Sequence, residues 1–316
     1  MNDLKNIKKI TGDASFRKFF RKKNNTYSSI IVYAKKEKFK NLIVYDAINK
    51  ILRKNKILAP KLYQENYNKN YIEIEDFGDD TIFKILSKSK NKKLIYFKKI
   101  LSLLNKLQLI KDKNIRNFNN KKYKIPLYSN KKLIDEANLF CDWYLKKRLS
   151  KNKKNLFVKK FNKIIKKLIL NLKLKNNIFV HRDFHVSNIM FTNKKVAIID
   201  SQDALIGNRA YDLASLIDDV RLKTSNSFKN KIFRLYLNSQ VKVDKKKFTN
   251  DFEILSILRN LKIIGIFTRL AIRDNKKKYL KLIPYTWSLI NLRINKNQLF
   301  KELKNLLKEN FKTQIK

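Results

Sequence analysis

Glycine is so scarce and so isolated in this 316-residue chain that it restricts the folds the chain can adopt. The four glycines stand singly, at Gly12, Gly78, Gly207 and Gly265. A phosphate-binding P-loop and the G-x-G-x-x-G turn of dinucleotide-binding folds both need clustered glycines. The sequence also has no G-x-S-x-G turn and no Cys/His cluster with zinc spacing. P-loop and dinucleotide-binding folds are therefore excluded, and the sequence shows neither a zinc site of this kind nor the nucleophile turn of the hydrolases.

The order of strand-like and helical patterns predicts an α+β chain that begins with a small sheet. Apolar residues alternate over 28–34 and 70–78, and a helical spacing lies between them at 39–54. Beyond that point the spacing is helical, with strands expected only at 176–180 and 195–200. The other expected segments are a polar loop at 111–132 and helices at 97–110, 133–149, 156–174, 211–222, 228–239, 249–272 and 296–312.

The length favours two lobes, because a single hydrophobic core stops growing at about 250–300 residues. We predict an N-terminal lobe over 1–78 and a C-terminal lobe over 79–316. Hydrophobic residues make up 43% of the chain, which is enough to build a core and does not match the composition of disordered chains.

The net charge of +49 raises the question of a polyanionic partner. Lys is spread through nearly every segment together with Asn and Ile, which is typical of a solvated surface and not of a selected patch. We therefore expect no specific nucleic-acid partner. A specific polyanion or an anionic membrane surface is the alternative.

The sequence predicts a cytoplasmic protein without a membrane span. Cys141 is the only cysteine, so no intramolecular disulfide can form. The first 16 residues hold no apolar run of signal-peptide length, and no window approaches 18 uncharged apolar residues. The amphipathic segment 297–312 is expected to pack on the larger lobe, with a membrane surface as the alternative.

The sign of the charge reverses between residues 183 and 219. Six acids and three bases fall in this stretch, a local charge of −3 in a strongly basic chain: Asp183, Asp200, Asp203, Asp212, Asp218 and Asp219 against Lys194, Lys195 and Arg209. Carboxylates concentrated in this way are typical of a site for a hard cation such as Mg²⁺.

The spacing within this stretch matches a kinase catalytic loop. In "HRDFHVSN" Asn188 follows Asp183 by five residues, and Asp200 ends the strand-like run "AIID". Protein kinases use H-R-D-x-x-x-x-N followed by a metal-binding Asp. We predict Asp183 as the base, with Asn188 and Asp200 holding Mg²⁺ beside the phosphates. Turn formation or helix capping is the alternative for such residues. His181 and His185 are expected to brace the loop, and His185 has a substrate contact as its alternative.

Several segments together resemble the aminoglycoside phosphotransferase family, relatives of protein kinases that phosphorylate small molecules. Within it the chain is most similar to the kinases that phosphorylate the anomeric hydroxyl of N-acetylmuramate or N-acetylglucosamine in cell-wall sugar recycling. The similar segments are "GDASFRKFFR" (12–21), "EDFGDDT" (75–81), "EANLFCDWYL" (136–145), "HRDFHVSNIM" (181–190), "IIDSQDALIGNRAYDLASLIDDVR" (198–221) and "RNLKIIGIFTRLAIRDNKKKYL" (259–280).

The resemblance implies a two-lobed protein-kinase-like fold, ATP and Mg²⁺ as cofactors, and a set of site residues. The N-terminal lobe would bind the nucleotide, and the C-terminal lobe would carry catalysis and the acceptor. The implied nucleotide contacts are Gly12, Asp13, Ala14 and Ser15 over the phosphates and Glu75, Asp76 and Phe77 at the hinge. The implied acceptor contacts are His185, Gln202, Asp203, Asp219 and Arg221, and more distantly Asp142, Trp143 and Arg273.

Two positions depart from the kinase pattern. Tyr33 stands where kinases carry the strand Lys that holds the α- and β-phosphates, with Lys35 and Lys36 slightly later. Ser201 stands where relatives carry Phe after the metal-binding Asp. Two alternatives to the amino-sugar kinase remain: a kinase of another acceptor, such as an aminoglycoside, choline or homoserine, and an inactive kinase-fold scaffold that binds polyanions.

Overall fold

The computed structural model describes most of the chain, as two compact units. The described residues are 7–10, 17–23, 26–34, 41–89, 92–295 and 297–315, without the side chain of residue 147. The first unit joins Met1–Pro126 to Ile178–Ile206, and the second joins Leu127–Asn177 to Gly207–Lys316. The predicted functional boundary at residue 78 stays a prediction. The predicted phosphate-covering residues 12–15 lie outside the described residues.

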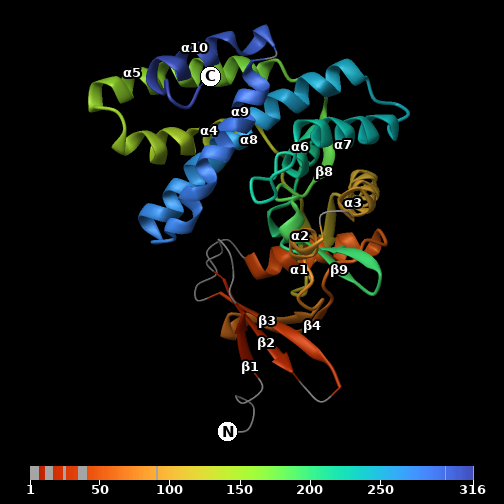
Figure 1. The fold of residues 1–316 in the computed structure, drawn as a ribbon. Helices are drawn as coiled ribbons and strands as arrows, with labels where there is room; N and C mark the ends of the chain where they lie inside the picture. Colours follow the sequence, from red (N-terminus) through yellow and green to blue (C-terminus); the bar gives the residue numbers. More distant parts are fainter. Residues whose placement is uncertain are drawn as a thin grey trace. The chain divides into compact units, whose positions relative to one another are not determined.

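The first unit is built on a five-stranded antiparallel sheet in the order β1-β2-β3-β5-β4 (Figure 1). Its strands are β1 (Ile7–Ile10), β2 (Lys18–Lys23), β3 (Ser28–Tyr33), β4 (Leu62–Asn66) and β5 (Tyr71–Glu75). The other elements of this unit are α1 (Asn41–Lys54), α2 (Ile82–Lys88), α3 (Lys93–Gln108), β6 (Asn114–Arg116), β7 (Lys122–Lys124), β9 (Ile189–Thr192) and β10 (Lys195–Ile198).

Alternation along the central strands creates the core of the first unit. Val32 of β3 and Ile72 and Ile74 of β5 pack with Leu42 and Tyr45 of α1, and all five are buried. Because successive side chains of a strand point to opposite faces, one face of the sheet meets α1. The strands and the helix expected here, at 28–34, 70–78 and 39–54, correspond to β3, β5 and α1.

The second unit is mainly helical. Its helices are α4 (Asn130–Leu139), α5 (Lys151–Leu170), α6 (Ala210–Ile217), α7 (Asn226–Asn238), α8 (Lys245–Arg273), α9 (Ile283–Ile294) and α10 (Lys301–Asn310). A π-helical turn, Phe140–Tyr144, follows α4. Strands β8 (Asn176–Val180) and β11 (Leu205–Asn208) pair where the chain passes between the units.

The expectation of only two strands after residue 78 was wrong. The Asn-rich segment expected as a loop contains the hairpin β6–β7, whose turn is organised by the Asn117 side chain accepting from the Asn119 and Lys121 N–H groups. Strands β9 and β11 are four residues each, too short to show a period. Helix α9 was also missed, because Pro284 reads as a breaker although it lies in the first helical turn, where proline is tolerated.

The C-terminal segment packs within the second unit, in agreement with the prediction that its apolar face packs on the protein and not on a membrane. Phe300, Leu303, Leu307 and Phe311 are all buried, and α10 lies along α5 (Figure 1). The ring of Phe311 joins an aromatic cluster with Phe140, Tyr144, Phe157 and Trp287. The apolar face of this helix therefore has a partner in its own unit.

Helix α8 approaches the end of α4 so closely that only glycine fits at the contact. A Cβ on Gly265 would lie 2.3 Å from the Leu139 carbonyl carbon and 2.6 Å from the Phe140 nitrogen. Helix propensity alone would make Gly265→Ala stabilising by about 0.5–1 kcal/mol. Because the clash is with backbone, we expect the opposite sign, a loss of about 1–3 kcal/mol in the free energy of unfolding by urea. A stabilised variant would contradict this packing.

A buried ion pair joins α9 to the end of α6 in the second unit. Arg293 Nη2 lies 3.0 Å from Asp218 Oδ1, with the two side chains 7% and 1% exposed. Ser256 of α8 donates to the same carboxylate, and Lys229 of α7 has its Nζ 3.9 Å away. Four segments of the second unit thus meet at one buried carboxylate.

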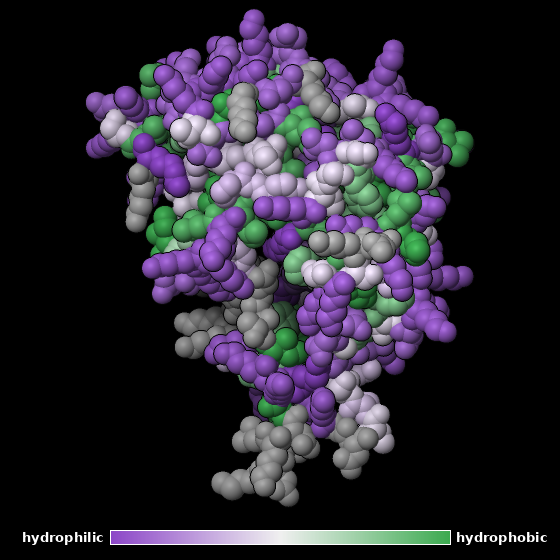
Figure 2. All heavy atoms as spheres, in the orientation of Figure 1, coloured by the Kyte–Doolittle hydropathy of each residue, from purple (hydrophilic) through white to green (hydrophobic). Residues whose placement is uncertain are grey.

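Hydrophilic residues predominate on the face of the molecule in Figure 2. Figure 2 shows hydrophilic residues over most of the face drawn, with apolar residues in small scattered groups. No helix in the described part of the chain is both long and apolar enough to cross a bilayer.

Candidate active site

The predicted catalytic loop runs from the end of β8 to the start of β9, within the first unit. It contains Arg182 with φ 73°, and Asp200 after β10 has φ 63°. Both residues occupy the left-handed region of backbone conformation, which is energetically unfavourable for residues other than glycine. Residues with such strained backbones cluster at functional sites. The backbone therefore has an unusual conformation next to the predicted base, at Arg182, and at the predicted metal ligand Asp200 itself.

Short contacts bring the three predicted catalytic residues to one place. Asn188 Nδ2 donates to the backbone oxygen of Asp183 at 3.0 Å. The Ile199 N–H, next to Asp200, donates to the backbone oxygen of Asn188 at 3.0 Å. The pairing of β9 with β10 continues this contact, with Ile189 opposite Ile198. Residues 183, 188 and 200 therefore lie on one loop and the hairpin that follows it.

The two histidines are buried beside the loop. His181 is 0% exposed, and its Nε2 lies 3.1 Å from the backbone oxygen of Ile199. Burial lowers the pKa of His181, against the opposing effect of the nearby Asp183 and Asp200 carboxylates. His181 makes the bracing contact that the sequence predicted. His185 is 6% exposed, with its Nε2 3.4 Å from the Asn188 amide nitrogen.

Arg17, which the sequence pattern did not indicate as a site residue, forms an ion pair with the predicted metal ligand Asp200. Arg17, just before β2, places Nη2 2.6 Å from Asp200 Oδ1 and donates from Nη1 to Gln202 Oε1 at 2.9 Å. Gln202 Nε2 donates in turn to Asp203 Oδ2, and Arg182 Nη1 donates to the Asp203 backbone oxygen. A polar chain therefore runs from Arg17 to Arg182 along the Asp200 turn.

Helix α1 is hydrogen-bonded to the turn that follows Asp200. Ser201 is fully buried, and its hydroxyl donates to Asn49 Oδ1 at 2.6 Å. The departure from Phe at this position thus replaces aromatic packing with a hydrogen bond to the helix. Tyr45, one helical turn earlier on α1, lies beneath the Arg17 guanidinium, and burial raises its pKa to about 12.

The predicted hinge is held by a second arginine, Arg21 of β2. Its Nε lies 2.6 Å from Asp76 Oδ2, and its Nη1 lies 2.9 Å from Asp79 Oδ2. The hydrogen bond from Arg21 lowers the pKa of the Asp79 carboxyl. The carboxylate of Asp76 also accepts from Ser28, so its side chain faces the sheet and leaves the hinge backbone as the part that can read a base.

The neighbours of Asp76 have structural partners too. Glu75 Oε2 accepts from the Lys61 N–H at 3.1 Å. Phe77 is buried against Met190 of β9 and Ala197 of β10, the two strands of the hairpin between Asn188 and Asp200. The predicted hinge therefore packs directly on the hairpin that joins the two predicted metal ligands.

The predicted acceptor residues are divided between the units. His185, Gln202 and Asp203 lie in the first unit beside the loop, whereas Asp219 and Arg221 belong to the second. Asp219 is 2% exposed, and its Oδ1 accepts from the Arg221 N–H at 2.9 Å, a local turn contact.

The three more distant candidates also lie in the second unit. Arg273 is paired with Asp274 at the end of α8. Asp142 and Trp143 lie in the π-helical turn, and burial raises the pKa of the Asp142 carboxyl.

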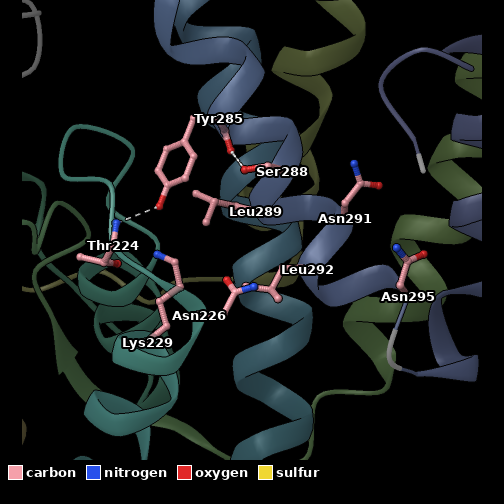
Figure 3. Close-up of a pocket in the computed structure, with 9 residues that line it drawn as sticks. All are labelled: Thr224, Asn226, Lys229, Tyr285, Ser288, Leu289, Asn291, Leu292 and Asn295. Atoms are coloured by element: carbon pink, nitrogen blue, oxygen red, sulfur yellow. Dashed lines mark hydrogen bonds between the residues drawn. The ribbon is translucent and has the colours of Figure 1, made fainter.

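The second unit has a pocket of its own, which is drawn in Figure 3. It encloses about 330 Å³ between the start of α7 and α9. Tyr285 reaches across it, with its hydroxyl 3.4 Å from the Thr224 nitrogen. None of the predicted acceptor residues lines this pocket, so it adds nothing to the candidate site.

A magnesium site of the kinase type fits the residues present. No group of three or more His, Cys, Asp or Glu side chains in the described ranges could hold a metal alone. Mg²⁺, however, keeps several waters and is held by one or two carboxylates together with substrate phosphates. The Asn188 amide nitrogen is turned to Asp183, which directs the amide oxygen elsewhere, and the Asp200 side chain is 35% exposed. One amide oxygen and one carboxylate match the donor set that such a site requires.

Solved structures with the same fold confirm the predicted kinase-like architecture. A choline/ethanolamine kinase family protein from Mesorhizobium loti superposes with a TM-score of 0.64 at 12% identity, covering 96% of this chain and 93% of that one. The ADP-bound aminoglycoside phosphotransferase APH(2'')-Ib superposes with a TM-score of 0.60 at 16% identity, covering 91% and 92%.

Sequence comparison gives closer relatives and the family. The N-acetylmuramate/N-acetylglucosamine kinase of Neisseria meningitidis serogroup B is 26% identical over 86% of this chain and 80% of its own length. The protein of the same name from Pseudomonas putida is 25% identical over 95% and 86%. The family model described as "Phosphotransferase enzyme family" matches residues 6–245. Since that match spans more than half of the sequence, the chain belongs to the phosphotransferase enzyme family.

Proposed function

We propose that this protein is an ATP- and Mg²⁺-dependent kinase that transfers the γ-phosphoryl group to the anomeric hydroxyl of N-acetylmuramate or N-acetylglucosamine. The observation that supports the kinase chemistry is that backbone contacts and strand pairing bring residues 183, 188 and 200 together on one loop and the hairpin that follows it. The amino-sugar acceptor is supported by the names of the relatives, which align over most of this chain.

Each residue of the hairpin has a distinct part in this proposal. Asp183 accepts the proton of the acceptor hydroxyl as the oxygen attacks the γ-phosphorus. Asn188 and Asp200 hold the Mg²⁺, which neutralises phosphate charge when it is bound. Buried His181, kept neutral by its lowered pKa, holds the Ile199 backbone and with it the position of Asp200.

The nucleotide would be held mainly by the backbone of the first unit. Glu75, Asp76 and Phe77 present main-chain groups at the hinge, since the Asp76 carboxylate is engaged by Arg21. The turn at 12–15 is proposed to cover the phosphates with backbone N–H groups. We retain residues 1–78 as the nucleotide-binding lobe and 79–316 as the catalytic and acceptor-binding lobe.

The sugar would be recognised by hydrogen bonds to its hydroxyl and amide groups. The residues proposed to contact the sugar remain those that the family resemblance implies: His185, Gln202, Asp203, Asp219 and Arg221. We place the protein in the cytoplasm, where ATP is available. Burial raises the pKa of Cys141 to about 12, which keeps this free thiol protonated and inert.

Purified protein supplied with ATP, MgCl₂ and one candidate sugar at a time tests the proposal. We expect ADP release with N-acetylmuramate or N-acetylglucosamine and a matching fall in the reducing-sugar signal, because a phosphorylated anomeric carbon no longer opens to an aldehyde. ADP release without that fall would place the phosphate on another hydroxyl. Turnover only with an aminoglycoside, choline or homoserine would remove the sugar assignment, and no turnover at all would favour the scaffold.

A further inference from the structure

The lysine clamp that kinases place on the nucleotide phosphates is not formed by the described residues of this sheet. Kinases carry that lysine on the third strand and pair it with an acid of the following helix. Strand β3 holds no lysine between Ser28 and Tyr33. Asp46 and Glu37 are the acids near this position in the sequence. Asp46 of α1 is paired with Lys50 of the same helix at 2.9 Å, and Glu37 lies outside the described residues. Lys35 and Lys36, which follow β3 in the sequence, lie outside the described residues. Within the described part of this sheet, a fixed positive charge for the phosphates has to come from another position.

Arg17 supplies a positive charge at the right place. It is 6% exposed. Its guanidinium touches Asp200 at 2.6 Å, and the carboxylate of Asp200 is the ligand proposed for the phosphate-bridging metal. The rings of Phe19 and Tyr45 lie 5.6 and 5.8 Å from the guanidinium carbon and hold it from two sides.

The chemistry of this group suits a polyphosphate better than a lone carboxylate. A guanidinium is always charged and presents its N–H donors in a planar fork that matches phosphate oxygens. Two of the acceptors of Arg17 are one carboxylate oxygen of Asp200 and the neutral amide oxygen of Gln202. A phosphate oxygen in place of that amide would exchange a neutral acceptor for an anionic one.

We infer that Arg17 is the phosphate clamp of this enzyme, holding the α- or β-phosphate of the nucleotide beside Asp200 in the role that a lysine of the third strand has in kinases. The inference rests on the proposed function. It makes Arg17 a nucleotide-binding residue that reaches the site from just before β2 instead of from β3, with its guanidinium held by Gln202 and the two aromatic rings.

Binding of ADP and of adenosine, each measured calorimetrically with MgCl₂ present, separates phosphate contacts from base contacts. Arg17→Gln and Arg17→Met remove the charge and are expected to weaken ADP binding by about 10- to 100-fold, because a hydrogen bond to a charged group is lost. Adenosine binding stays unchanged, and Arg17→Lys restores much of the loss. Lys18→Met removes one charge from the adjacent, exposed position and changes neither affinity.

The outcomes are distinct. Neutral Arg17 variants that still bind ADP as tightly as the wild type would overturn the clamp while leaving the kinase assignment intact. Variants that lose ADP and adenosine equally, including any that fail to fold, would assign Arg17 to the structure of the sheet and also overturn it. Wild-type protein that binds neither compound would remove the proposed function itself.

Discussion

Asp183→Asn is expected to lower kcat for sugar phosphorylation by about 10²- to 10⁴-fold, the range that a positioned general base contributes. The side chain is half-buried and projects from a loop whose backbone is fixed by Asn188. Asparagine has nearly the same shape and cannot accept the hydroxyl proton, so the fold and ADP binding stay as in the wild type. Steady-state kinetics and ADP calorimetry measure the two effects separately.

Asp112→Asn is the matched control for this change. Asp112 is a carboxylate of the same unit, paired with Lys54 and outside the candidate site. Its replacement removes the same charge and should leave kcat within about twofold, since exposed pairs contribute little. Activity in Asp183→Asn as high as in Asp112→Asn would show that another group is the base. A parallel loss of ADP binding would instead indicate that the loop had moved.

The largest loss of stability is expected from Arg293→Met in the second unit. This change leaves the Asp218 carboxylate, 1% exposed, without its closest cation. Breaking a buried ion pair by removing one partner costs about 3–5 kcal/mol. Lys229, with its Nζ 3.9 Å from the same carboxylate, should keep the loss near the lower end. Urea unfolding followed by circular dichroism measures it.

Lys167→Met provides the comparison for the buried pair. Lys167 is ion-paired with Glu302 on the surface of the same unit, where the two side chains are 60% and 53% exposed. An exposed pair of this kind contributes at most about 1 kcal/mol. If Arg293→Met cost no more than Lys167→Met, the Asp218 carboxylate would have to be protonated or hydrated, contrary to the burial described above.

The site residues that could be predicted are those that lie close together in the sequence. Asp183 and Asn188 lie five residues apart, and Asp200 ends the next strand, so their meeting follows from local spacing and one hairpin. The contact between Arg17 and Asp200 joins residues 183 positions apart. No local pattern encodes such a contact, because it depends on how β2 and the Asp200 turn are packed around α1.

The length of each element explains which helices and strands could be predicted from the sequence. The long α8 and the sheet strands β3 and β5 have enough residues for their periodicity to appear in the sequence. Four-residue strands such as β9 do not, and they form because a partner strand is held opposite them. Helix α9 was hidden by a proline whose position in the first turn becomes visible only when the start of the helix is known.

The hydrogen bond between Asn49 and Ser201 has a consequence for regulation. Switchable protein kinases are turned off when the helix after the third strand swings away from the metal-binding Asp. Here such a swing would leave the Ser201 hydroxyl and the Asn49 amide oxygen, both buried, without partners at a cost of about 1–3 kcal/mol each. The hydrogen bond therefore opposes separation of α1 from the Asp200 turn, and we expect the two to move as one piece.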